Sequence, residues 1–402
     1  MNAIYSRSHP NNAVITNSNN NGVYKSYAVA STVNLKSKRI SLTRTKAVKK
    51  EMTGCRLMGV GSCTPKLVLH NRDMEKFVNT TDEWICSRTG IRERHIIGRG
   101  ETLTQLSINA AQRALEMAGV SAKDVDMIIM ATSTPDDTFG NACQVQYGVG
   151  ASKAVAFDLS AACSGFVVAL NTAVQFIRTG SAHRILVIGA DAMSRIIDWR
   201  DRSTCVLFGD GAGAVLLSAS DCPEAVATKA PNSNSTAPSS SDCALLGMFM
   251  ASDGQGHKSL KAVYAGEHEK PLQPDDVASG HASYKNVQMA GQEVYKFAVR
   301  TVPAALETAL KRAELNKSDV DWLVMHQANQ RIMDAAAARL NLAPTRVVSN
   351  LARYGNTSAA SIPLALDEAV RDGRIQHGDV LAMVGFGAGL TWASAIVKWG
   401  KF

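Results

Sequence analysis

The chain has 402 residues, of which 46% are hydrophobic and 30 are glycine, a composition that suits compact α/β domains with a large buried core. No apolar run is long enough to span a bilayer, and the eight cysteines form no C-x-x-C pair, so neither a zinc site nor a disulfide framework is indicated. The net charge of +8 comes from the N-terminal segment, because residues 1–50 hold nine of the 43 basic residues and none of the 35 acidic ones. The remainder is nearly neutral, so the charge does not point to nucleic acid as a partner.

Residues 1–50 have the composition of an organelle transit peptide: they are basic, free of acids and rich in Ser, Asn and Thr. A secretory signal is not indicated because a continuous apolar segment is missing. A basic tail that stays attached is the alternative. The Asn and Ser content suits a plastid at least as well as a mitochondrion, and we expect folding to begin near Glu51–Cys55.

The stretch AVAFDLSAACSGF (residues 154–166) contains the most informative cysteine. Apolar residues alternate up to Leu159 and predict a buried strand, whereas Phe166–Ile177 has helical spacing. Cys163 therefore lies where a strand ends and a helix begins. Free N–H groups and the helix dipole favour an anion at such a place, so the thiol is expected to lose its proton readily and to act as a nucleophile. A buried structural cysteine is the alternative.

Three segments further along the chain indicate loops or close packing. The glycines of Gly209–Gly213 lie between apolar stretches and lack the spacing of a nucleotide-binding loop, so close packing is the better interpretation. Asp221–Leu245 is rich in Pro, Ser and Asn, which marks a surface linker or insertion. A second flexible stretch is expected at Ala265–Ser283.

An internal repeat indicates a duplicated fold with two similar halves. AGVSAKDVDMIIM (residues 118–130) matches AELNKSDVDWLVM (residues 313–325), and each follows a helical segment and ends in an apolar strand. Likewise, strand Ile185–Ile188 has a later counterpart in Val380–Val384. We therefore expect an N-terminal half (51–220) and a C-terminal half (246–402), joined by 221–245, with mixed sheets and buried helices. Ligands gather at strand ends in such sheets.

The second half supplies candidate partners for Cys163. His326 follows the strand Trp322–Met325, and Asn356 follows Gly355, which permits a tight turn before a predicted helix over Ser358–Val370. By the repeat, the Asn356 loop corresponds to the one that carries Cys163. A structural histidine and a helix N-cap asparagine are the alternatives.

Glycines at Gly385–Gly389 could expose backbone N–H groups to an oxyanion.

The chain resembles the β-ketoacyl-acyl carrier protein synthase III family of thiolase-like condensing enzymes. The resemblance covers roughly Cys55–Trp399 and is to the plastid type of this family. The stretches that carry the resemblance are TTDEWICSRTGIRERHI, ATSTPDD, DLSAACSGF, DRSTCVLFGDGAGAV, MHQANQRI, YGNTSAAS and GFGAGLTW. The resemblance implies an α/β, thiolase-like duplicated fold: two similar halves with mixed β-sheets and buried helices in an α-β-α-β-α arrangement.

The resemblance also implies a reaction in two halves. Cys163 takes an acyl group, most simply acetyl, from acyl-CoA, and malonyl-acyl carrier protein then enters. His326 and Asn356 donate hydrogen bonds to its thioester oxygen as CO2 departs, which requires a proton on Nε2 of His326. The backbone N–H groups of Cys163 and Ala388 hold the second oxyanion. No metal or cofactor is implied beyond acetyl-CoA as a substrate.

Roles in binding substrates and partners are assigned to several further residues by the resemblance alone. Trp84 and Arg202 match residues that sandwich the CoA adenine, and Arg88 matches a CoA contact. Phe139 matches the residue that a partner subunit contributes to the acyl pocket, which implies a homodimer. The alternatives are a core or half-buried aromatic for Trp84, a core phenylalanine for Phe139 and ordinary surface charge for the arginines.

Lys296 and Arg331 match basic positions offered to the carrier protein, with a solvated charge as the alternative. The sequence departs from the family pattern at two positions. Gln292, where a pantetheine contact is expected, stands where asparagine is usual, and Ala388 replaces a glycine.

Two other functions remain open at this level. One is a related acyltransferase that forms an ester or thioester without decarboxylation. The other is a non-catalytic homologue, against which the presence of Cys163, His326 and Asn356 argues.

Overall fold

The computed structural model describes residues 53–223, 245–263 and 285–400, and the structural statements below refer to these ranges. The transit peptide predicted for 1–50, nearly all of the linker predicted for 221–245 and the stretch 265–283 lie outside them.

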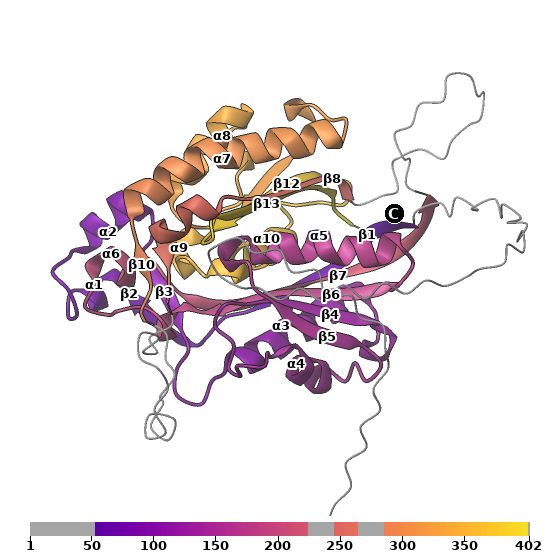
Figure 1. Cartoon of the computed structure of the whole chain (residues 1–402), viewed down its shortest axis with the longest axis horizontal. Helices are drawn as coiled ribbons and strands as arrows, with labels where there is room; N and C mark the ends of the chain where they lie inside the picture. The colour runs from indigo at the N-terminus through magenta and orange to yellow at the C-terminus, as the bar shows by residue number, and fades with distance from the viewer. Residues whose placement is uncertain (1–52, 224–244, 264–284, 401–402) are drawn as a thin grey trace, which may run out of the picture. The chain divides into compact units, whose positions relative to one another are not determined.

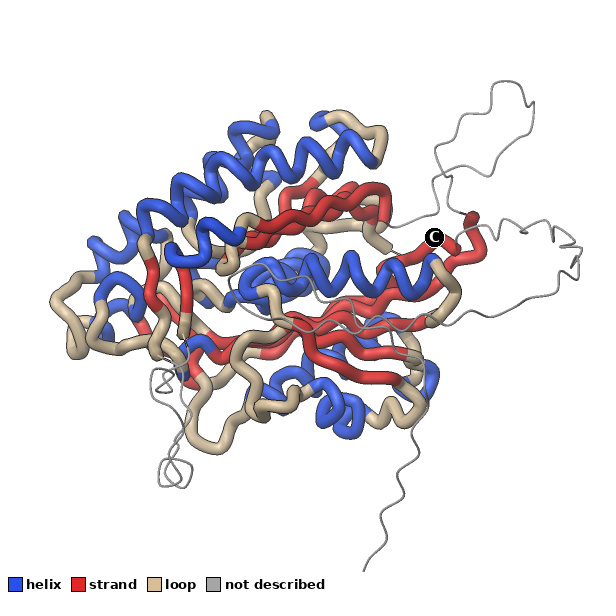
Figure 2. The backbone as a smooth tube through the Cα atoms, viewed as in Figure 1, coloured by secondary structure: helices blue, strands red, loops and turns tan. Residues whose placement is uncertain are grey.

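Helices and two β-sheets alternate in layers (Figure 1). The larger sheet has five strands in the order β1-β7-β6-β4-β5, and the other has four in the order β11-β12-β13-β8. Helices α5 and α10 lie between the sheets, α3 and α4 cover the outer face of the larger sheet, and α7 and α8 cover that of the other. Figure 2 shows the same alternation by element type. The predicted α-β-α-β-α arrangement is confirmed.

The strands are β1 Thr53–Cys63, β2 Leu67–His70, β3 Glu93–Ile96, β4 Met127–Ala131, β5 Val155–Leu159, β6 Arg184–Ala192, β7 Asp210–Pro223, β8 Leu245–Ser252, β9 Leu260–Lys261, β10 Gln288–Met289, β11 Trp322–Met325, β12 Val380–Gly387 and β13 Thr391–Lys398. The α-helices are α1 Asn71–Met74, α2 Asp82–Thr89, α3 Leu103–Ala118, α4 Ala142–Val149, α5 Gly165–Arg178, α6 Arg202–Cys205, α7 Gly291–Arg312, α8 Gln330–Leu340, α9 Leu351–Tyr354 and α10 Ser361–Arg371.

The order of strand pairing repeats between the two sheets. β4 runs parallel to β6 and β11 runs parallel to β12, while β6 and β12 each have an antiparallel neighbour, β7 and β13. The repeated sequence forms the same succession both times, a helix, a 3₁₀ turn (Ala122–Asp124 and Lys317–Asp319) and a strand. The second sheet has no full counterpart of β5 among the described residues, where only an isolated bridge joins Leu323 to Val347. The half boundaries at 220 and 246 stay predictions.

Helix α5 is buried on nearly all sides because it lies between two sheets. Phe166, Leu170 and Val174 are almost wholly shielded from solvent and belong to the core cluster that also contains residues of both sheets. Burying one such side chain contributes about 1.5–3 kcal/mol. This packing fixes the start of α5, and with it the turn that carries Cys163.

The prediction of a buried strand before Cys163 is wrong. β5 is the last strand of its sheet and pairs only with β4, and its Val155 side chain is 60% exposed. Alternating apolar residues are also what an edge strand shows, so the pattern could not distinguish the two positions.

Candidate active site

Cys163 lies in a 3₁₀ turn, Ala162–Ser164, between β5 and α5, at the predicted strand–helix junction. The side chain is only 7% exposed. β12 passes directly against this turn, because a Cβ on Gly387 would lie 2.9 Å from both the N and the Cβ of Cys163. A glycine at that position is therefore required by the close approach of the two backbones.

The expectation of a readily ionised thiol is wrong for this state of the site. Burial is the main cause that raises the pKa of Cys163 to about 12, and the charge of Asp191 acts in the same direction. The Ser358 hydroxyl donates to Sγ at 3.4 Å and partly offsets this effect. A helix N-terminus contributes about 0.3–2 kcal/mol, which is less than the cost of placing a thiolate away from water. The thiol is thus neutral near pH 7.

His326 directly follows β11, and its backbone N–H donates to the carbonyl of Val384 at 2.9 Å. The imidazole is 2% exposed, packs edge-on against Phe386, and its Nδ1 lies 2.7 Å from the Ser361 hydroxyl. Burial lowers the pKa of His326 to about 3. The ring is therefore neutral at physiological pH.

Asn356 occupies the turn that Gly355, with φ +64°, makes possible. Its backbone bridges to Phe208, and its side-chain Oδ1 accepts the N–H of Ser358 at 2.9 Å. Since the amide oxygen is engaged there, the NH2 group is the end available to a substrate. Asn356 is not the N-cap of α10, because that position is held by Ala360.

The three predicted catalytic residues line one cavity of about 160 Å³. They reach it from separate elements: the turn before α5, the end of β11 and the turn after α9. Its remaining walls are largely apolar and consist of Leu207, Phe208, Leu260, Met289, Gly291, Val294, Tyr295, Ala328, Asn329, Ile332, Phe386 and Gly387. The arrangement places a thiol, a neutral imidazole and an amide around one small space, as acyl transfer requires.

Ala388 begins the turn after β12, beside the Cys163 turn. Its carbonyl accepts the Thr391 hydroxyl at 3.1 Å, and the same hydroxyl lies 2.7 Å from Ser164 Oγ. These bonds fix the two turns to each other. The position is compatible with the predicted oxyanion-binding pair of Cys163 and Ala388 backbone amides.

Trp84 and Arg202 lie together, with the guanidinium carbon 4.7 Å from the ring centroid. Arg202 also donates to the carbonyl of Asn79 at 3.0 Å. A flat base can enter between them only if Arg202 moves away from the indole. Arg88 is exposed at the end of α2. Its backbone carbonyl accepts a hydrogen bond from the side-chain amide of Asn329, a residue of the cavity wall.

The residues predicted for pantetheine and the carrier protein lie on α7 and α8. Gln292 is exposed in the first turn of α7, next to Gly291 of the cavity wall. Lys296 is exposed and paired with Glu293 at 2.9 Å, so part of its charge is already matched. Arg331 stacks on Tyr295, with 5.4 Å between the guanidinium carbon and the ring centroid.

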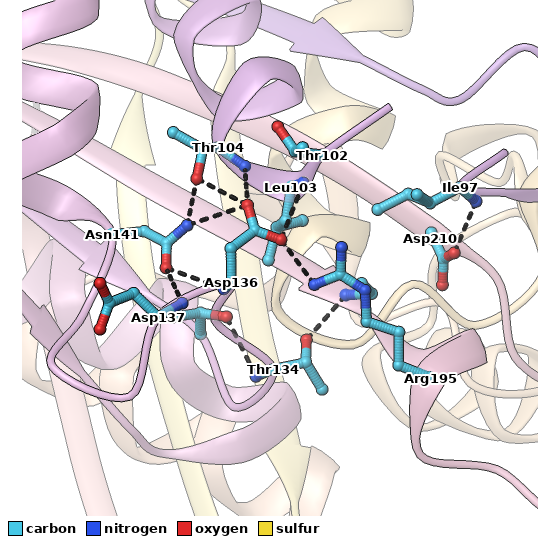
Figure 3. A network of polar contacts seen from close by, with 12 residues as sticks. Ile97, Thr102, Leu103, Thr104, Thr134, Asp136, Asp137, Asn141, Arg195 and Asp210 are labelled. Carbon is cyan, nitrogen blue, oxygen red and sulfur yellow. Dashed lines mark hydrogen bonds and ion pairs between the residues drawn. The ribbon is translucent and has the colours of Figure 1, made fainter. Parts of the chain in front are cut away.

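Phe139 is 99% exposed, so the alternative of a core phenylalanine is wrong. Its loop is nevertheless rigidly held (Figure 3). The carboxylate of Asp136 accepts the N–H and hydroxyl of Thr104 at 2.7 and 2.6 Å and pairs with Arg195 at 2.6 Å. The Asn141 side chain accepts the N–H of Asp136 at 2.9 Å. The loop thus presents a large apolar side chain at its surface while its polar residues are tied to the neighbouring elements.

Three polar residues of the site were not predicted: Ser358, Ser361 and Asp191. Both serines lie in the small-residue stretch after Asn356, where the sequence indicated only a turn and a helix start. Asp191 lies within an apolar strand, and a charged residue in such a context was the available signal.

The described ranges contain no helix that is both long and apolar enough to cross a membrane, and no group of three or more His, Cys, Asp or Glu residues suited to a metal.

The fold and the cysteine-centred cavity define a thiolase-like acyltransferase. Two family models match, the 3-oxoacyl-[acyl-carrier-protein] synthase III model over residues 157–233 and the C-terminal model of the same enzyme over residues 310–399. The chain is 54% identical over 344 residues to the β-ketoacyl-[acyl-carrier-protein] synthase III of Microcystis aeruginosa, which covers 86% of this chain and 97% of the relative. The corresponding Synechocystis protein is 49% identical over 347 residues, which cover 86% of this chain and 98% of the relative.

Solved structures agree with this assignment. The 3-oxoacyl-[acyl-carrier-protein] synthase III of Aquifex aeolicus superposes with a TM-score of 0.74 at 40% identity, over 86% of this chain and all of that one. The Thermus thermophilus β-ketoacyl-[acyl-carrier-protein] synthase III structure superposes with a TM-score of 0.73 at 40% identity, over 86% of this chain and all of that one. The chain belongs to the β-ketoacyl-[acyl-carrier-protein] synthase III family, the condensing enzymes that initiate type II fatty acid synthesis.

Proposed function

We propose that the chain joins an acetyl group from acetyl-CoA to malonyl-acyl carrier protein, giving a 3-oxoacyl-carrier protein, CO2 and CoA. The observation that carries this proposal is the convergence of Cys163, His326 and Asn356 on one cavity. Cys163 attacks the acyl-CoA thioester and holds the acyl group while CoA leaves. The Asn356 amide and the His326 ring then stabilise the enolate that forms as CO2 departs, and this carbanion attacks the acyl-cysteine.

Labelled acetyl-CoA tests the first half of the reaction. The wild-type chain is expected to become labelled, and Cys163→Ser is expected to abolish labelling. Cys143→Ser is the matched control, because Cys143 is an exposed thiol and reports non-specific acylation. Label that persists in Cys163→Ser contradicts the proposal.

Malonyl-acyl carrier protein separates decarboxylating condensation from simple acyl transfer. Release of CO2 together with a 3-oxoacyl product supports the proposed reaction. Transfer of label to an ester or thioester without CO2 release supports the alternative acyltransferase.

We propose that CoA binds across Trp84, Arg202 and Arg88, and that the carrier protein approaches Lys296 and Arg331. The half-buried indole and the nearby cations suit an adenine and its phosphates once Arg202 moves off the ring. Because Lys296 is already paired with Glu293, Arg331→Glu is expected to raise the KM for malonyl-carrier protein more than Lys296→Glu does. Equal, unchanged KM values in both variants contradict the docking assignment.

We propose a homodimer in which Phe139 enters the partner's acyl pocket. Support comes from the unpaired edge of β5 and from the exposed apolar side chains of Val155, Phe139 and Tyr147, which are 60%, 99% and 86% exposed. Edge strands that lack protection pair readily with a second chain.

We propose that residues 1–50 direct the protein to the plastid stroma. Their basic, acid-free composition and the similarity of the remaining chain to cyanobacterial enzymes support this location. A fluorescent protein fused to residues 1–50 is expected to enter plastids. Mitochondrial or cytosolic fluorescence contradicts the proposal.

A further inference from the structure

Gln327 is a buried amide that the reaction described above does not use. It directly follows His326 and is 1% exposed. Burying an amide is costly unless its polar atoms find hydrogen-bond partners. Here Nε2 donates to the carbonyls of Met325 and Val348 at 2.7 and 3.2 Å, and Oε1 accepts the N–H of Asn350 at 3.1 Å. The side chain thus joins two segments that lie more than 20 residues apart in the chain.

The first of these segments is the end of β11, where His326 enters the cavity. The peptide between Met325 and His326 is held at both of its polar atoms. Its N–H donates to the carbonyl of Val384 in β12 at 2.9 Å, and its carbonyl accepts from Gln327 on the other side. A peptide held in this way has little freedom to rotate. The Gln327 bond therefore helps to fix the direction of the His326 Cα–Cβ bond, and the contact with Ser361 then orients the ring.

The second segment leads to Asn356. Asn350 immediately precedes the short helix α9, and its carbonyl accepts the N–H groups of Arg353 and Tyr354 at 3.0 and 3.2 Å. Asn356 follows two residues after this helix ends. A single helical turn is not stable by itself and needs contacts with its surroundings. The bond from the Asn350 N–H to Gln327 anchors the start of α9, and with it the turn that carries Asn356.

We propose that Gln327 is a positioning residue that sets the distance and relative orientation of His326 and Asn356. This role rests on the proposed function, in which both side chains donate to the same thioester oxygen of malonyl-carrier protein as CO2 departs. The separation of the two donors therefore matters most in that step. Acylation of Cys163 depends instead on the backbone amides of Cys163 and Ala388. The side-chain bonds of Gln327 run to β11 and to the segment before α9, and not to the turns that carry those amides.

Two substitutions remove the bonds of Gln327 in different ways. Gln327→Glu keeps the length of the side chain and an oxygen that can accept the Asn350 N–H. It replaces the donor NH2 with an oxygen that faces the carbonyls of Met325 and Val348. Gln327→Met removes all three bonds and adds no charge. It therefore keeps the test decisive if Gln327→Glu does not fold.

The two half-reactions are measured separately, as CO2 release from malonyl-carrier protein and as acylation by labelled acetyl-CoA. Both Gln327 variants are expected to lower kcat for CO2 release about 10–10²-fold, because a small misplacement of reacting groups has an effect of this size. The KM for malonyl-carrier protein and the acylation rate are expected to stay within about threefold of wild type, since carrier docking and the Cys163 turn are unchanged.

Gln146→Met is the matched control. The half-buried Gln146 amide also donates to a backbone carbonyl, that of Ala151 at 2.7 Å, but it lies on α4, which covers the outer face of the larger sheet. This variant is expected to keep both half-reactions. Urea unfolding shows which variants are folded under the assay conditions.

Wild-type CO2 release in both Gln327 variants overturns the positioning role. An equal loss of both half-reactions also overturns it, because such a loss marks a residue that serves only the fold. The same holds for a loss that falls on KM and leaves kcat unchanged. A wild-type chain that releases no CO2 from malonyl-carrier protein would instead overturn the proposed function itself.

Discussion

The Ser361 hydroxyl contacts both Nδ1 of His326 and the carbonyl of Ser358. The Ser361 hydroxyl lies 2.7 Å from Nδ1 of the ring and donates to the carbonyl of Ser358 at 2.8 Å. When the Ser361 hydroxyl donates its proton to that carbonyl, its oxygen accepts a hydrogen bond from Nδ1–H of His326. Nε2 then carries a lone pair and can only accept a hydrogen bond. Rotation of the hydroxyl toward Nδ1 leaves the proton on Nε2, which is the donor that an enolate needs. Ser361 can thus provide for either tautomer.

We expect Ser361→Ala to lower the decarboxylation of malonyl-carrier protein about 10–100-fold, in line with the loss of a residue that orients a reacting histidine. CO2 release measures this effect. Ser107→Ala is the matched control, because Ser107 is equally buried, donates to a helix carbonyl and lies on α3. Normal CO2 release from Ser361→Ala would show that the serine does not govern the ring.

We expect Asn356→Asp to abolish condensation while it spares acylation by acetyl-CoA. The aspartate Oδ1 can still accept the Ser358 N–H at the observed 2.9 Å, so the turn is kept. The donor amide is replaced by an oxygen that repels the enolate, and losing one such donor costs about 10²–10³-fold. The two half-reactions are measured separately, and loss of both would indicate that the turn has collapsed.

The two similar halves with mixed sheets and buried helices could be predicted because the helix and strand patterns repeat in the sequence, whereas the five-layer arrangement followed from the family resemblance. The start of α5, the end of β11 and the turn at Gly355 all follow from local patterns, and these three features position the catalytic residues. The acidity of Cys163 could not be predicted, since it depends on burial by β12, more than 200 residues away in the chain.

Acid is expected to destabilise the fold partly through His326. Its pKa is lowered from 6.5 to about 3, so between these values the unfolded chain binds a proton that the folded chain excludes. Stability therefore rises with pH across this window, by up to about 1.4 kcal/mol per pH unit, and the contribution is complete above 6.5. Urea unfolding of wild type and His326→Gln from pH 4 to pH 7 measures it. The difference between the two proteins should change with pH, and parallel curves would contradict the buried neutral ring.

Val155→Asp is expected to convert the proposed dimer to a monomer, because the charge is placed on the edge of β5 that has no neighbour among the described residues. Light scattering measures the mass. Met250→Asp is the control, since Met250 is 48% exposed on β8, the edge strand of the other sheet. A Val155→Asp protein that keeps its dimeric mass would place the interface elsewhere.

Gly387→Ala is expected to damage the active site and the fold together. The added Cβ would lie 2.9 Å from the backbone N and the Cβ of Cys163, so either β12 or the Cys163 turn must move. Overpacking of this kind costs about 1–3 kcal/mol, and displacement of the turn also misaligns Sγ with the acyl-CoA carbonyl. We expect a lower midpoint of urea unfolding and slower acylation at saturating acetyl-CoA. Gly254→Ala is the control, because a Cβ there meets no atom within 4 Å. If Gly387→Ala acylates at the wild-type rate, the close approach of β12 does not position the nucleophile.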